Sequence, residues 1–219
     1  MMFKNEKLEF NKIPIKDIIK KSKKFYEIIS KRRSVRDFDS KKIDLEIIKN
    51  AILSAGSAPN GANLQPWHFV IIKDKKIKKK IRIAAENEEK EFYEKKAPKE
   101  WLKALEPLGT DENKKFIENA PVLIAIFEKK YSFQKKKKIK NYYVRESVGI
   151  ATGILISCLH MSGLCMLTHT PSPMGFLNKI LNRPKNERPF LLLVVGLPKE
   201  SVKVPNIKRK QLHEITSYY

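Results

Sequence analysis

The sequence predicts an α+β fold in which helices cover both faces of a central mixed sheet. Four short runs have strand character, and helical segments separate them. The runs are apolar at nearly every position, which is typical of strands buried on both faces. With 219 residues and no internal repeat, the chain fits one domain. We therefore expect a single domain over 1–219, with a helical lead-in at 1–24 and an extended tail at 199–219.

Six segments carry the 3.6-residue periodicity of helices: 13–32, 44–56, 75–96, 111–120, 145–163 and 174–182. The first shows this periodicity in two separate pieces. In the second, Asp44 is the expected N-cap and Gly56 the residue that follows the last turn. The third is long and highly charged, and the fourth ends at Pro121. The fifth is apolar on most sides, which predicts a central position.

The four predicted strands are 67–74, 122–128, 164–170 and 190–198. The lysine-rich run QKKKKIKN, residues 134–141, is predicted to be an exposed loop. No apolar run approaches the ~20 residues that span a bilayer. The N-terminus carries charges where a secretion signal would be apolar. These features predict a cytoplasmic protein that has no membrane segment.

The net charge of +22 raises the question of nucleic-acid binding. Only eight of the 46 basic residues are Arg, and the lysines are spread over almost every segment. Specific nucleic-acid readers depend on Arg for bidentate contacts, so we expect no specific nucleic-acid partner. The two cysteines, Cys158 and Cys165, are wrongly spaced for a zinc site, and the four histidines are scattered. The sequence therefore predicts no metal site.

In two stretches, polar groups occur at positions where the fold alone would not require them. In KRRSVRDF, residues 31–38, three of the few arginines surround a serine. Guanidinium groups and a hydroxyl suit phosphate oxygens, although a basic turn after a helix explains this stretch about equally well. In SAGSAPNGANLQPW, residues 54–67, Gly61 and Ala62 present bare backbone to which a ligand could come close. An ordinary connection from helix to strand is the alternative.

Two further stretches carry possible ligand contacts. THTPSPMG, residues 168–175, follows the third strand, and its threonine hydroxyls could donate to a ring nitrogen of a cofactor. A Thr/Pro turn is the alternative. Arg209 lies in the basic segment IKRKQL, which a phosphate could order. Taken alone, that segment is better explained as surface charge.

Four motifs occur in an order that resembles the FMN-dependent nitroreductase superfamily, and the resemblance is closest to its iodotyrosine deiodinases. They are KRRSVRDF, SAPNGANLQPWHFVII, APVLIAIF and GLCMLTHTPSPMG. The resemblance runs from about residue 25 into the tail. It implies an intertwined homodimer with two FMN sites at the interface, each drawing on both chains, and a tail that lies on the partner chain.

The resemblance also implies which residues bind FMN. In this sequence they are Arg32, Arg33, Ser34, Val35, Arg36, Pro59, Asn60, Gly61, Thr168, His169, Thr170 and Arg209. Thr170 would donate a hydrogen bond to the flavin N5, which makes it the expected catalytic contact. His169 stands where animal deiodinases have threonine, and we expect its side chain to face away.

The resemblance to deiodinases implies a substrate site for a halotyrosine. Glu89, Tyr93 and Lys114 would bind the amino acid group, and the Ala62 backbone N–H would bind the phenolate. Lys115 is an alternative to Lys114. Positions i and i+4 share one helix face, so Glu89 and Tyr93 could act together. Chance is the alternative, because the helix is rich in Glu and Lys.

The expected function is FMN-dependent reductive dehalogenation of halotyrosines by an oxidoreductase. A general NAD(P)H-dependent nitro- or quinone reductase of the same fold is the second hypothesis. A lysine-rich module that binds polyanions without catalysis is the third. Electrons would come from NAD(P)H or from a separate reductase.

Overall fold

The computed structural model describes residues 5–219 and divides into two units, Met1–Arg32 and Arg33–Tyr219. The described part of the first unit contains helix α1, Ile15–Ile29. α1 is one continuous helix, although its apolar pattern comes in two pieces. None of its 15 residues is buried, and large apolar side chains such as Ile15, Ile19 and Phe25 are exposed. An amphipathic helix of this kind normally covers another surface.

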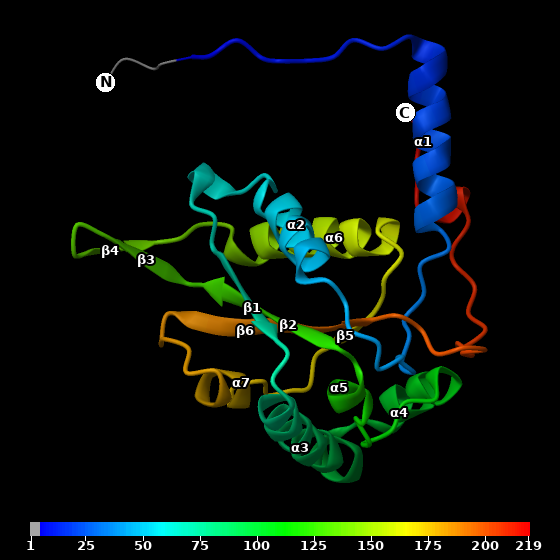
Figure 1. Ribbon diagram of the computed structural model, residues 1–219, viewed down its shortest axis with the longest axis vertical. Coiled ribbons are helices and arrows are strands. Elements are labelled where there is room, and N and C mark those ends of the chain that lie inside the picture. Colours follow the sequence, from blue (N-terminus) through cyan, green and yellow to red (C-terminus); the bar gives the residue numbers. More distant parts are fainter. Residues whose placement is uncertain (1–4) are drawn as a thin grey trace. The chain divides into compact units, whose positions relative to one another are not determined.

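The second unit is built on a four-stranded sheet in the order β1-β2-β6-β5 (Figure 1). The strands are β1 Trp67–Ile72, β2 Val122–Lys129, β5 Cys165–His169 and β6 Glu187–Gly196. All three pairings between them are antiparallel. Parallel pairing within the described residues is confined to a single bridge between Ser34 and Met166, so the sheet is mixed only at the edge strand β5.

Helices cover both faces of this sheet, as the sequence predicts (Figure 1). On one face lie α2 Leu45–Gly56 and α6 Val144–Met161, and on the other lie α3 Lys75–Glu91, α5 Phe116–Asn119 and α7 Phe176–Ile180. Alternate residues of β2 point to opposite faces of the sheet and pack into two separate hydrophobic cores. Ile124 and Ile126 pack with α2 and α6, whereas Leu123, Ala125 and Phe127 pack with the opposite helices.

Local signals explain some of the helix ends. The Asp44 carboxylate accepts from the N–H of Glu46, which confirms the predicted N-cap of α2. Gly56 is the last residue of α2 and Ser57 is the C-cap, so the prediction that Gly56 lies just beyond the helix was wrong. Gly163 has a φ of 83°, a left-handed conformation that suits glycine after the end of α6.

The lysine-rich run was predicted to be a loop, and that prediction was wrong. Residues 131–140 form a hairpin of β3, Tyr131–Gln134, and β4, Lys137–Lys140. Lys135 and Lys136 both have positive φ, as a tight two-residue hairpin turn requires. Glycine or asparagine usually marks such a turn, and neither occurs here.

The segment between α3 and β2 also differs from expectation. A π-helical turn, Phe92–Lys96, follows α3, and helix α4, Lys99–Leu105, was not predicted. α5 is only four residues long because an Asp111 side chain that accepts from the Asn113 N–H turns the chain before it. Among the described residues, no helix is both long and apolar enough to cross a membrane.

Gly196, at the end of β6, offers a test of how tightly the second unit is packed. A Cβ at this position would lie 2.7 Å from Phe38 and 2.9 Å from Pro121. We expect Gly196→Ala to lower the free energy of unfolding by about 1–3 kcal/mol, because neither neighbour can move easily. Urea denaturation of both proteins measures the difference.

Gly56→Ala is the matched control, because a Cβ at Gly56 meets no atom within 4 Å. This variant should be neutral or more stable by up to about 1 kcal/mol. Equal unfolding midpoints for Gly196→Ala and the parent would contradict the packing described here.

Candidate active site

A cavity of about 240 Å³ lies where the end of β5 meets the C-terminal part of α3. Apolar side chains from α4 and its surroundings form part of its wall, including Phe92, Trp101, Leu105 and Leu108. The polar lining brings together seven residues predicted for the site: Arg36, Glu89, Tyr93, Lys114, Thr168, His169 and Thr170. The chain thus gathers them from four separate segments.

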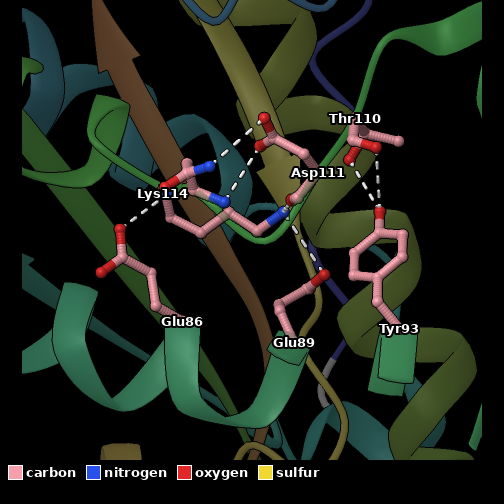
Figure 2. A network of polar contacts seen from close by, with 7 residues as sticks. Glu86, Glu89, Tyr93, Thr110, Asp111 and Lys114 are labelled. Atoms are coloured by element: carbon pink, nitrogen blue, oxygen red, sulfur yellow. Dashed lines mark hydrogen bonds and ion pairs between the residues drawn. The ribbon is translucent and has the colours of Figure 1, made fainter. Parts of the chain in front are cut away.

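An ion pair between Glu89 and Lys114 is the central charged contact of the cavity (Figure 2). The Lys114 Nζ lies 3.3 Å from Glu89 Oε2, and the two side chains are 4% and 15% exposed. The Lys114 ammonium also donates to the main-chain carbonyl of Asp111. Lys115 is exposed and lies outside this cavity lining. The geometry therefore joins Lys114, rather than Lys115, to Glu89.

Tyr93 completes this cluster from the π-helical turn that follows α3 (Figure 2). Its hydroxyl lies 3.2 Å from the Thr110 hydroxyl and 3.3 Å from the Thr110 carbonyl oxygen. Its ring centroid lies 5.8 Å from the Lys114 ammonium. Burial raises the pKa of the Tyr93 phenol, so the hydroxyl remains a hydrogen-bond donor at neutral pH.

Strand β5 supplies the opposite wall. Thr168 and Thr170 are exposed, whereas His169 between them is buried, as the alternation of a strand requires. The His169 ring packs edge-on against Phe116 at a centroid distance of 5.6 Å and still lines the cavity. Burial lowers the pKa of His169 to about 3, and the positive charges of Lys114 and Arg36 add to the effect. The imidazole is therefore neutral at physiological pH.

The segment 33–36 runs along the edge of the sheet beside β5. The Val35 N–H donates to the Met166 carbonyl at 3.2 Å, and the Val35 side chain is buried. Arg33 donates to the main-chain carbonyl of Pro205, which fastens the tail to this segment. Arg209 is exposed further along that tail and does not line the cavity. Arg32 is the last residue of the first unit.

The loop 59–65 lies elsewhere, against the start of α6. A Cβ on Gly61 would lie 2.9 Å from the Tyr142 carbonyl oxygen, so only glycine fits this approach. The Asn60 carboxamide accepts from the Gln65 N–H at 2.8 Å and donates to the Ala58 carbonyl. Ala62 has a φ of 49°, a left-handed conformation that is uncommon for residues other than glycine. None of the residues Pro59 to Ala62 lines the cavity described above.

Two contributors to the cluster had no signal in the sequence. Glu86 accepts from the Lys114 main-chain N–H at 2.9 Å, and Thr110 binds the Tyr93 hydroxyl (Figure 2). Glu86 precedes Glu89 by three residues on the same helix face, but the many acidic residues of α3 conceal it. Among the described residues, no group of three or more His, Cys, Asp or Glu side chains could hold a metal ion.

Comparison with known proteins adds three findings. Residues 29–197 match the model of the nitroreductase family. A protein of Haliscomenobacter hydrossis named iodotyrosine deiodinase is 50% identical over 93% of this chain and 92% of its own length. Human iodotyrosine deiodinase 1 is 42% identical over 94% of this chain and 72% of its own length.

Solved structures agree with these sequence relatives. An oxidized iodotyrosine deiodinase bound to FMN and 3-iodo-L-tyrosine superposes with a TM-score of 0.75 at 32% identity. The match covers 89% of this chain and 100% of that one. A BluB-like flavoprotein from Clostridium difficile 630 matches with a TM-score of 0.67 at 23% identity, over 88% of this chain and 97% of that one, which shows the shared fold.

The buried His169 predicts how stability depends on pH. Its pKa is about 3 in the folded chain and near 6.5 when unfolded, so the unfolded chain binds more protons between these values. The part of the folding stability that depends on a neutral His169 is complete above pH 6.5 and is lost as the pH falls towards 3. Between pH 7 and pH 4, the parent should lose roughly 3 kcal/mol more stability than His169→Asn. Urea denaturation at both pH values measures this, and parallel losses would contradict it.

Proposed function

Because the chain belongs to the nitroreductase family and shares half of its residues with an iodotyrosine deiodinase, we propose that it dehalogenates halotyrosines reductively with FMN. One observation carries this proposal beyond the family. Glu89, Tyr93 and Lys114 meet at one cavity beside two exposed threonines at the end of β5. An anion, a phenol and a cation in this arrangement complement an amino acid zwitterion.

The residues present fit FMN. Thr168 and Thr170 expose hydroxyls beside the cavity, and Arg36 brings a guanidinium group to the same space. A hydroxyl suits the polar edge of a flavin, and guanidinium groups suit its phosphate. We assign the cofactor to Arg32, Arg33, Ser34, Val35, Arg36, Pro59, Asn60, Gly61, Thr168, His169, Thr170 and Arg209, with Thr170 at the reacting ring. When bound, FMN supplies the electrons of the reaction.

The chain's own residues bind and orient the substrate. Glu89 and Lys114 neutralise each other at 3.3 Å. A halotyrosine would bring an ammonium to Glu89 and a carboxylate to Lys114, so each buried charge exchanges one partner for another. The Tyr93 hydroxyl, which binds Thr110, would donate to the same carboxylate. The apolar residues of α4, with Trp101 among them, would exclude water from the site.

The placement of the loop supports completion of the site by a second chain. Pro59 to Ala62 do not line the cavity of their own chain, and they are the expected contacts to the flavin and the phenolate. A homodimer would bring the loop of one chain to the cavity of its partner, where the Ala62 N–H would bind the phenolate. The exposed apolar residues of α1 support the need for a covering chain. The cytoplasmic location expected from the sequence stays a prediction.

A general NAD(P)H-dependent nitro- or quinone reductase is the second candidate. The solved structure at 23% identity shares the fold but favours no particular substrate. Such an enzyme would need the flavin and an open cavity, but not the buried Glu89–Lys114 pair. Either candidate would take its electrons from NAD(P)H or from a separate reductase.

Binding of 3-iodotyrosine separates the two candidates. We expect it to quench the fluorescence of bound FMN in the parent protein. Glu89→Gln should weaken this binding by roughly 30-fold, about 2 kcal/mol, because the ammonium of the bound amino acid then has no carboxylate partner. Glu91→Gln is the control, since Glu91 pairs with Lys96 on the exposed surface of the same region. Equal affinity in parent and Glu89→Gln would favour the general reductase.

The two-chain site predicts the mass and colour of the protein. Purified protein should be yellow and should sediment at twice the chain mass of 25.5 kDa. Analytical ultracentrifugation with detection at flavin wavelengths measures both properties. A colourless monomer that does not take up added FMN would exclude both flavin-dependent candidates and leave the polyanion-binding module.

A further inference from the structure

A second group of charged contacts lies next to the main chain of Lys114, outside the cavity lining. On α3, Arg82 lies four residues before Glu86, and Glu86 lies three residues before Glu89, so all three share one helix face. Their side chains are partly buried, with Arg82 23% and Glu86 22% exposed. They do not line the cavity, which separates them from the residues expected to bind substrate.

Glu86 holds the main chain of Lys114 rather than its side chain. One carboxylate oxygen accepts from the Lys114 N–H at 2.9 Å (Figure 2), and the other is bound by the Arg82 guanidinium. The same guanidinium binds Glu118 on α5 through its Nε. Arg82 therefore holds the Glu86 carboxylate in place and connects it to α5, the helix that follows Lys114.

Unlike the main chain of Lys114, its ammonium is not held by Glu86. Its partners are Glu89 and the Asp111 carbonyl, and the proposed substrate would take Glu89 away from it. A lysine side chain has four rotatable bonds, and its ammonium is a point charge without preferred direction. The bond to the Asp111 carbonyl and the main-chain contact with Glu86 do not involve Glu89, so neither is lost in this exchange. The direction of the ammonium then depends on how firmly that main chain is fixed.

We propose that Glu86, supported by Arg82, is a positioning residue that aims the Lys114 ammonium at the carboxylate of an amino acid substrate. The inference rests on the proposed function, because it assigns Lys114 to that carboxylate. It goes further in naming a residue that touches neither substrate nor cofactor and yet sets the preference for a zwitterionic ligand.

The surrounding contacts argue against a role of Glu86 in folding alone. α5 is fastened to α3 independently by Lys78, whose ammonium donates to the carbonyls of Glu118 and Ala120 at 2.8 and 2.6 Å. Ile117 of α5 is fully buried in the core. Loss of Glu86 should therefore loosen the chain around Lys114 while α5 and the sheet remain in place.

The test compares two ligands of the FMN-loaded protein, 3-iodotyrosine and 2-iodophenol. Both carry the halogenated phenol, but only the first has a carboxylate for Lys114. We expect Glu86→Ala to weaken 3-iodotyrosine binding about tenfold, the effect of about 1.4 kcal/mol, and to change 2-iodophenol binding less than about twofold. Flavin fluorescence titration measures both, and Glu91→Ala is the control that removes an exposed ion pair near the same end of α3.

A double-variant cycle tests whether Glu86 acts through Lys114. Lys114→Met removes the ammonium but keeps the main-chain N–H. In this background, Glu86→Ala should cause little further loss of 3-iodotyrosine affinity, so the two losses should not add. If Glu86→Ala fails to fold, Glu86→Met removes the acceptor while keeping a side chain of similar length, and it provides the same comparison.

The outcomes separate the inference from the proposed function. Equal weakening of both ligands, no weakening of either, or additive losses in the cycle would overturn the role of Glu86. Each of these would leave the proposed function intact, provided that the parent binds 3-iodotyrosine. A parent that binds FMN but not 3-iodotyrosine would overturn the proposed function and, with it, the inference.

Discussion

Burial of the β2–β6 strand pair on both faces is the constraint on which the rest of the second unit depends. Seven of the eight residues of β2 are buried, and the last five of β6 are as well. A sheet centre without a solvated face must be covered by helices above and below. Polar groups can then gather only where strands end or at the edge strand. The cavity occupies such a place, beside the end of β5.

The sequence could predict the elements that follow simple periodicity. The four strands, α2, α3 and α6 lie close to their expected ranges, because apolar spacing and caps such as Asp44 are local signals. The 131–140 hairpin was missed, because Lys135 and Lys136 adopt positive φ without the usual glycine. The length of α5 depends on the Asp111 turn, and α4 has too few residues for a clear pattern.

The candidate site, like the fold, could be predicted from the sequence only in part. The resemblance supplied Glu89, Tyr93 and Lys114, and their meeting at one cavity agrees with helix spacing. The distinction between Lys114 and Lys115 required three dimensions, since neighbouring lysines look alike in a sequence and only one is buried. Glu86 could not be singled out, because its partner is a main-chain N–H. The neutral state of His169 also follows from packing, against Phe116 and near two cations.

The contact between Arg33 and the tail has a consequence for how such a chain can change over evolutionary time. Arg33 binds the carbonyl of Pro205, a group that every residue possesses. Substitutions along the tail can therefore accumulate without loss of this anchor, provided that the backbone keeps its course. Length should be under stricter selection than composition there, and insertions or deletions before Pro205 should be purged first.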